Sequence, residues 1–326
     1  MPLFDNKRFI FVETALLSLI CTMDNRKKRD DIRNMGKGYY HFCTDGLKGA
    51  KLFYTSAQFA YGMILIGLLT LKFNIKVYAF VLMPNHIHII LSGTGENCLK
   101  VFDYLRKKIS LHLIRDGYPP LLPDYGFVLV PITDPRRMKS EIAYVLRNPL
   151  EKNISIPYGY PWGSGWLYHS SMACYYKGTL VSDMSKRAVK RLFTTCDSIP
   201  LHWEYSQERG LNPAGFLDMS LTDKLFPTPK DMETFLVKDY ESYVRIANEL
   251  GETMEFSPSE IKDIVTSVLQ TKFGGMSLNN LSEDEKCKLA VELANKYNFS
   301  TFEISRSIFL KEHIVRQVLN SKDYRQ

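Results

Sequence analysis

A run of β-prone residues interrupted by a single Pro-Asn pair is the most constraining feature of this sequence. Residues 76–83 read Lys-Val-Tyr-Ala-Phe-Val-Leu-Met, Pro84-Asn85 follows, and residues 86–92 continue as His-Ile-His-Ile-Ile-Leu-Ser. Two such runs on either side of a turn signal predict an antiparallel hairpin. Because side chains alternate between the two faces of a strand, His86 and His88 are expected on the same face.

The segments around this hairpin predict strands and helices in regular alternation. Further strands are expected over residues 39–44 and 125–132, and helices over 56–71, 99–115 and from Pro135 to a termination or distortion at Pro149. The order strand, helix, strand, strand, helix, strand, helix predicts an α+β fold. We expect a ferredoxin-like, mainly antiparallel sheet with packed helices.

At 326 residues the chain is long enough for more than one folding unit. We expect an N-terminal extension over residues 1–34, the α+β domain over 35–175, a linker or accessory helical region over 176–257 and a helical C-terminal domain over 258–326. The formal net charge of +7 suits a polyanionic partner better than an acidic one.

The cysteines and the apolar stretches indicate a cytoplasmic protein. The six cysteines are scattered, without the close pairs that build zinc ribbons or redox sites. Residues 59–73 are too few to span a bilayer comfortably, and Glu13 interrupts the apolar stretch over 9–23. We therefore expect no membrane partner and a cytoplasmic, nucleoid-associated location.

Two residue pairs carry the candidate chemistry. Two imidazoles on one face of a strand can hold one divalent cation between them. Tyr144 and Asn148 are four residues apart in a predicted helix and therefore share a helical face, as a nucleophile and a further metal ligand would. The alternatives are a structural histidine pair, a tyrosine packed in the core and an asparagine that ends its helix before Pro149.

The combination of these motifs resembles a known family. Residues 81–90 resemble the His-hydrophobe-His signature of the HUH single-tyrosine transposases, and residues 144–150 resemble their downstream tyrosine helix. The sequence is most similar to the REP-associated tyrosine transposase (RAYT) family, in which a Tyr-Pro-Trp-Ser-Ser-like stretch follows. Here that stretch is Tyr-Pro-Trp-Gly-Ser over residues 160–164, so Gly163 departs from the family pattern. The resemblance spans roughly residues 39–171.

The resemblance implies an enzyme with a defined set of site residues. His86 and His88 would bind Mg²⁺ or Mn²⁺, Asn148 would be the third ligand, and Tyr144 would be the nucleophile. The implied activity is that of a transposase-like DNA endonuclease and strand transferase, which cuts single-stranded DNA through a 5′-phosphotyrosine intermediate. Hairpin or palindromic repeats would be its DNA partners, in transposition or DNA recombination, and the oligomeric state stays open between monomer and dimer.

Other functions fit the same residues less well. A histidine-triad hydrolase would have a third alternating histidine where this chain has Ile90. A zinc site of the carbonic anhydrase type needs a distant histidine, for which His41, His112 and His169 are available without any signal that places them. No Gly-rich phosphate loop indicates an ATPase. A domesticated DNA-binding protein that does not cut is the alternative within the same family.

Two sets of side chains are candidates for DNA contacts. In the α+β domain, basic residues on two predicted helices could follow a phosphate backbone or could be ordinary solvated residues: Arg106, Lys107, Lys108, Arg136, Arg137 and Lys139. Residues 300–319 are similar to a helix-turn-helix, although Phe309 stands where glycine is usual in the turn. Its recognition helix, residues 312–320, would offer Lys311, His313, Arg316 and Gln317, unless these helices only pack.

Overall fold

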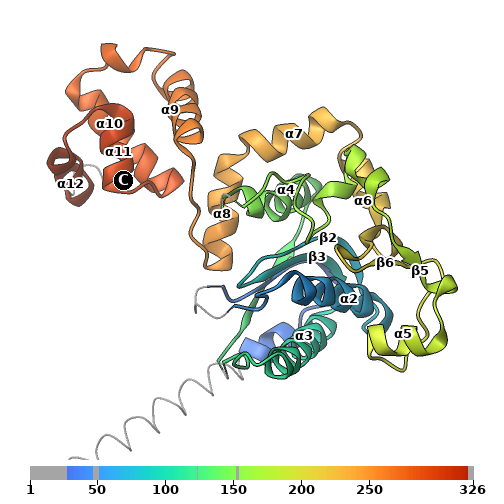
Figure 1. The fold of residues 1–326 in the computed structure, drawn as a ribbon. Helices are drawn as coiled ribbons and strands as arrows, with labels where there is room; N and C mark the ends of the chain where they lie inside the picture. The colour runs from blue at the N-terminus through green and yellow to red at the C-terminus, as the bar shows by residue number, and fades with distance from the viewer. Residues whose placement is uncertain (1–27, 47–50, 123, 152–153, 322–326) are drawn as a thin grey trace, which may run out of the picture.

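A four-stranded antiparallel sheet forms the centre of the α+β domain (Figure 1). The computed structural model describes residues 28–46, 51–122, 124–151 and 154–321. The strands are β1 (Gly38–Thr44), β2 (Lys76–Leu82), β3 (Ile87–Gly93) and β4 (Phe127–Ile132), in the order β2-β3-β1-β4 with every pair antiparallel. Helix α2 (Ser56–Lys72) connects β1 to β2, and α3 (Gly95–Arg115) connects β3 to β4. This βαββαβ connectivity is that of a ferredoxin-like sandwich.

The alternation of side chains divides the sheet into an apolar face and a second face, the polar face, on which polar side chains lie among apolar ones. Phe42 and Phe127 stack on the face that α3 covers, where Phe102 lies 4.6 Å from the Phe127 ring centroid. The opposite face carries His41, Cys43 and His88 beneath helix α4 (Pro135–Glu151). The sheet register pairs Cys43 directly with His88. Polar side chains are thus gathered in the layer between the sheet and α4.

Helix α4 continues past Pro149 to Glu151, so of the two outcomes expected at this proline, termination and distortion, termination does not occur. A proline inside a helix removes one backbone hydrogen bond, to the carbonyl four residues earlier. Pro149 stands close to the end of α4, which continues only to Glu151, so few later helical bonds are affected. The Pro149 carbonyl then accepts the N–H groups of Ile154 and Ser155, which caps the end of the helix.

The region from 176 to 257 contains a second sheet and is therefore not purely helical. Its three short strands are β5 (Thr179–Leu180), β6 (Glu204–Ser206) and β7 (Gly210–Leu211), and β7 packs against α2. Its helices are α5 (Lys186–Phe193), α6 (Met219–Leu225), α7 (Pro229–Lys238) and α8 (Tyr240–Leu250). Short 3₁₀ helices occupy Gly165–Leu167, Ser171–Tyr175, Val181–Asp183 and Pro213–Gly215, with another at Leu278–Asn280.

Four helices form the C-terminal bundle, shown in orange to dark red in Figure 1. They are α9 (Pro258–Lys272), α10 (Glu283–Tyr297), α11 (Thr301–Ile308) and α12 (Glu312–Asn320), and α10 packs against α8. Ser257, Ser282 and Ser300 each form a capping box at a helix start, which stabilises these short helices.

Part of the expected N-terminal extension packs against the α+β domain. Residues 28–33 form a helix whose Ile32 side chain is buried, and Arg29 forms a salt bridge of 2.7 Å with Asp103 of α3. Residues 1–27 of the expected extension lie outside the described residues. No helix in the described part of the chain has the length and apolar character needed to cross a membrane.

A row of polar contacts joins α4 to the segment between residues 239 and 260. The α4 side chains occur every three or four residues, and each contacts an acidic partner: Arg137 with Glu249, Ser140 with Asp239, Tyr144 with Glu252, and Arg147 with Glu260. Arg147 is a deeply buried cation, with 1% of its side chain exposed. Its guanidinium lies 2.6 Å from Glu260 and 4.8 Å from the ring centroid of Tyr243.

We expect the substitution Arg147→Met to destabilise the protein by about 3 kcal/mol, because it removes a buried cation from Glu260 and from the Leu236 carbonyl. The measurement is denaturant unfolding followed by circular dichroism. Arg136→Met on the same helix is the control; this side chain is exposed, so its effect should stay within about 0.5 kcal/mol. Equal effects of the two substitutions would contradict a stabilising role for the Arg147 contacts.

Candidate active site

The two histidines of the sequence motif lie side by side under α4. His86 directly precedes β3 and His88 lies within it, so both side chains leave the polar face of the sheet. His86 is 5% exposed and His88 is fully buried, with their ring centroids 4.7 Å apart. The tight connection from β2 through Pro84 and Asn85 therefore places two imidazoles together in a closed layer.

The structure brings the other two predicted site residues to these histidines. Asn148 lies with its Oδ1 3.1 Å from His86 Nε2 and its Nδ2 3.2 Å from His88 Nε2. One helical turn earlier, the Tyr144 ring centroid lies 5.8 Å from that of His88. Tyr144 is only 2% exposed. The four residues that the motifs singled out thus form one buried cluster.

Glu252 is a fifth member of the cluster that the sequence did not indicate. Its Oε2 accepts a hydrogen bond of 2.7 Å from the Tyr144 hydroxyl, and its Oε1 lies 3.4 Å from His88 Nε2 and 3.7 Å from His86 Nε2. Burial raises the pKa of Glu252, but His88, His86 and the Tyr144 hydroxyl more than offset it and hold the pKa well below its usual value. The carboxylate is therefore anionic at neutral pH.

A chain of hydrogen bonds behind His88 sets which of its ring nitrogens carries the proton. Glu141 Oε2 lies 2.7 Å from His41 Nδ1, and His41 Nε2 lies 2.9 Å from His88 Nδ1. Burial lowers the pKa of His41 despite the opposing effect of Glu141, so a neutral His41 imidazole is favoured. A carboxylate only accepts, so His41 donates from Nδ1 and accepts at Nε2. His88 then donates from Nδ1 and keeps its lone pair on Nε2.

The tautomer of His86 follows from a similar argument. Asn85 Nδ2 donates to the Gly46 carbonyl at 2.8 Å, which turns Asn85 Oδ1 toward His86 Nδ1, also at 2.8 Å. His86 Nδ1 must therefore donate, and the lone pair of neutral His86 is also on Nε2. Both imidazole lone pairs point at Asn148 and Glu252.

This donor set fits a divalent cation. The Asn148 amide lies between the two imidazole lone pairs, so its oxygen faces one of them whichever way the amide is turned. Glu252 Oε1 adds another lone pair at 3.4 Å from His88 Nε2. An oxygen and an imidazole lone pair repel each other when they are in direct contact. The same arrangement becomes favourable when a cation lies between them. Two nitrogen and two oxygen donors could together hold one divalent cation.

Cys43 offers a different, softer set of donors. Atoms of Cys43, His88 and Glu252 lie within 4.8 Å of one another, a spacing that could hold a metal ion. The Cys43 thiol donates to Glu252 Oε1 at 3.6 Å, and burial followed by the charge of Glu252 raises its pKa well above the usual value. Cys43 is thus a protonated thiol at neutral pH while no cation is bound, and it would have to lose this proton to bind one.

Sequence signals existed for Glu141 but not for Glu252. Glu141, Tyr144 and Asn148 follow one another at intervals of three and four residues, so a carboxylate shares the helical face of the two motif residues. His41 alternates with Cys43 along its strand, yet only the sheet register shows that it reaches His88. Glu252 lies in the connection after α8, where no periodicity or motif marks it.

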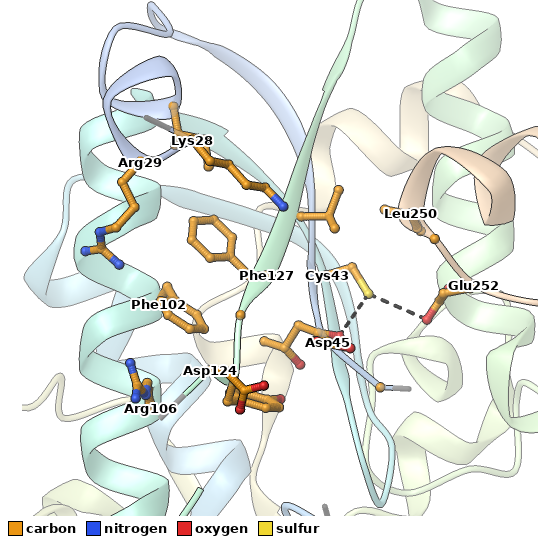
Figure 2. A pocket seen from close by; sticks show the side chains of 17 residues that line it. Lys28, Arg29, Cys43, Asp45, Phe102, Arg106, Asp124, Phe127, Leu250 and Glu252 are labelled. Carbon is orange, nitrogen blue, oxygen red and sulfur yellow. Dashed lines mark hydrogen bonds between the residues drawn. The ribbon is translucent and has the colours of Figure 1, made fainter. Parts of the chain in front are cut away.

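A pocket of about 330 Å³ opens at the start of β4 and reaches the Glu252 side of the cluster. In Figure 2, Lys28, Arg29 and Arg106 lie on one side of this strand, and Cys43, Asp45 and Glu252 lie on the other. The pocket therefore connects a basic surface with the buried cluster.

The basic residues expected to contact DNA lie on two separate surfaces, because α3 and α4 cover opposite faces of the sheet (Figure 1). On α3, Arg106 lines the pocket, Lys107 is exposed and Lys108 lies over the Tyr104 ring. On α4, Arg136 is exposed, Arg137 is paired with Glu141 and Glu249, and Lys139 lies over Phe226 and Phe235. Arg137 therefore supports the site from within the protein.

The C-terminal helices place the expected recognition residues on the surface. Helices α11 and α12 pack together through buried residues that include Ile304, Ile308 and Val315. Phe309, in the turn between them, has a left-handed backbone with φ of 54° and is 75% exposed. Lys311, His313, Arg316 and Gln317 are all exposed.

Comparison with known proteins gives one match. No family model matches this chain, and no curated protein matches it significantly. The chain is similar to a solved structure of a REP-associated tyrosine transposase bound to a REP hairpin, with 16% sequence identity and a TM-score of 0.32 over 53% of this chain and 88% of that one. At this TM-score the likeness supports no inference about the chemistry of the cluster.

We expect Glu141→Gln to change the tautomer of His88. A glutamine amide can donate to His41 Nδ1, which reverses the chain of hydrogen bonds and moves the His88 proton to Nε2. The measurement is the ¹⁵N chemical shift of the His88 ring nitrogens above pH 7. Glu249→Gln is the matched control, since it removes the other carboxylate that Arg137 contacts but leaves His41 untouched. Unchanged His88 shifts in Glu141→Gln would refute the proton assignment.

Proposed function

We propose that this chain is a divalent-metal-dependent enzyme that cuts and rejoins single-stranded DNA through a covalent bond between Tyr144 and a 5′-phosphate. The observation that carries the proposal is the clustering of the Tyr144 hydroxyl with two imidazoles whose lone pairs converge with Asn148 and Glu252. The HUH and tyrosine-helix motifs of the sequence, which resemble those of the RAYT family, support the same chemistry and the choice of hairpin DNA as substrate.

In this proposal His86, His88 and Asn148 hold Mg²⁺ or Mn²⁺. When bound, the cation withdraws charge from the scissile phosphate and stabilises the departing 3′ oxygen. His41 and Asn85 accept hydrogen bonds from the Nδ1–H groups of His88 and His86, which leaves Nε2 of each ring to face the cation. Such supporting hydrogen bonds orient ligands and raise their basicity.

Tyr144 supplies the nucleophile. A tyrosine hydroxyl has an ordinary pKa of about 10 and attacks poorly until its proton is removed. Glu252 accepts a hydrogen bond from this hydroxyl and is the group positioned to receive the proton. A bond then forms between Tyr144 Oη and phosphorus while the bond from phosphorus to the 3′ oxygen breaks, and the 3′ oxygen takes up a proton. One phosphodiester replaces another, so a second 3′-hydroxyl can reverse the step without ATP.

The surfaces around the site suit a single strand of DNA. The pocket at β4 is lined by Lys28, Arg29 and Arg106, whose charges favour phosphate groups near the cluster. The exposed side chains of α12 would bind the target as a recognition helix does. A domesticated DNA-binding protein without cleavage remains the alternative, which needs none of the buried donors and is separated from an enzyme by the following test.

We expect Tyr144→Phe to abolish covalent adduct formation while leaving DNA affinity within about twofold, because one hydroxyl contributes little to phosphate binding. The assay incubates single-stranded hairpin oligonucleotides with Mg²⁺ or Mn²⁺ and detects protein–DNA adducts on a denaturing gel. His86→Ala should lose metal-dependent cleavage. Tyr243→Phe is the matched control, since this neighbouring tyrosine donates to the Phe235 carbonyl instead. An SDS-resistant complex with Tyr144→Phe would show that another residue is the nucleophile.

We expect Lys311→Ala to weaken DNA binding through the loss of one phosphate contact. The slope of log affinity against log salt should fall by about 0.9 if the contact is made to duplex DNA, as in a hairpin stem. Fluorescence anisotropy across a salt series measures this slope. Lys288→Ala on α10 removes an exposed lysine from the same bundle and should leave the slope unchanged. If the wild type, Lys311→Ala and Lys288→Ala all show the same slope, a packing role for α12 would be favoured.

A further inference from the structure

Glu252 is held in place by the end of helix α8. Gly251 adopts a left-handed backbone with φ of 73°, which turns the chain back at the helix terminus. The Glu252 N–H then donates to the Ala247 carbonyl at 2.8 Å. The backbone of Glu252 is therefore set by a helix cap, and its side chain enters the cluster from a defined position.

The Glu252 carboxylate has two kinds of partner, one on each oxygen. Oε2 accepts from the Tyr144 hydroxyl, whereas Oε1 faces His88 Nε2 at 3.4 Å and His86 Nε2 at 3.7 Å. The Cys43 thiol also donates to Oε1, at 3.6 Å. Only 15% of the side chain is exposed. Among the described residues, the salt bridges of Glu252 involve these histidines and no lysine or arginine. A buried anion needs a positive charge beside it, and a cation bound between Glu252 and the two imidazoles would supply that charge.

We propose that Glu252 is a further ligand of the divalent cation, supplied by the connection between α8 and α9, and that it positions the Tyr144 hydroxyl beside that cation. This inference rests on the proposed metal-dependent function. Oε1 completes the donor set of His86, His88 and Asn148, while Oε2 keeps its contact with Tyr144. One carboxylate thereby links the cation to the nucleophile.

Because Glu252 lies in the connection between α8 and α9, a cation bound to it would also affect the segment that leads to the C-terminal bundle. The connection from Gly251 to Phe256 leads directly into α9 and the C-terminal bundle. A cation bound by Glu252 would fasten this connection to the α+β domain, whereas a cation held only by His86, His88 and Asn148 would not. The two cases predict different protection of the amides over residues 251–256 against hydrogen exchange, as well as different affinities for the cation.

The test measures Mn²⁺ binding to the full chain by isothermal titration calorimetry. We expect Glu252→Gln to weaken Mn²⁺ binding by at least about tenfold, because a neutral amide replaces an anionic ligand. Glu255→Gln removes a carboxylate from the same connection at an exposed position and should bind Mn²⁺ as the wild type does. Wild-type affinity in Glu252→Gln would overturn the inference.

Hydrogen exchange provides a second readout on the unaltered chain. Mn²⁺ should slow the exchange of amides over residues 251–256 in the wild type and in Glu255→Gln, but not in Glu252→Gln. If Mn²⁺ binds the wild type without slowing this segment, Glu252 is not a ligand, even if the variant fails to fold. Loss of Mn²⁺ binding in His86→Ala would then leave the proposed function standing. A wild-type protein that binds no Mn²⁺ would overturn both.

Discussion

The packing of α4 on the polar face of the sheet is the contact on which the site depends. It closes a layer in which His41, His88, Glu141 and Asn148 are almost without solvent. Polar groups buried in this way are tolerated only when each finds a partner, and the chain from Glu141 through His41 to His88 supplies those partners. The same chain leaves an imidazole lone pair directed at Asn148. The hydrogen bonds that satisfy these buried polar groups are therefore the same ones that direct the His88 lone pair toward Asn148.

The sequence predicted the local half of this arrangement well. The histidine pair and the Tyr144–Asn148 pair are each defined by spacing within one element, and alternation along a strand or a helical turn suffices to give each pair a common face. The strands and helices between residues 38 and 151 were expected within a few residues, apart from the start of α3 and the passage of α4 through Pro149. What could not be predicted depends on tertiary structure. The register that pairs Cys43 with His88 and the cap that directs Glu252 inward leave no periodic signal, and the second sheet consists of strands too short to show alternation.

In the proposed site, the charge of the ligands would set a compromise between affinity for the cation and the charge that the cation retains for the phosphate. Neutral imidazoles and an amide would leave a bound cation its full double charge for the phosphate, but would hold it weakly. One carboxylate strengthens binding and lowers the remaining charge. By accepting a hydrogen bond on its other oxygen, the same carboxylate also orients the Tyr144 hydroxyl. Preorganisation of this kind reduces the entropy that must be lost before reaction.

The row of acidic partners along α4 also bears on how such a chain can be divided. Arg147 is buried beside Glu260, and Arg137 shares its charge between Glu141 and Glu249, so residues beyond the α+β domain neutralise cations that the domain itself contributes. A fragment ending near residue 175 would leave Arg147 without Glu260 and Arg137 without Glu249. We therefore expect such a fragment to be less stable than the full chain.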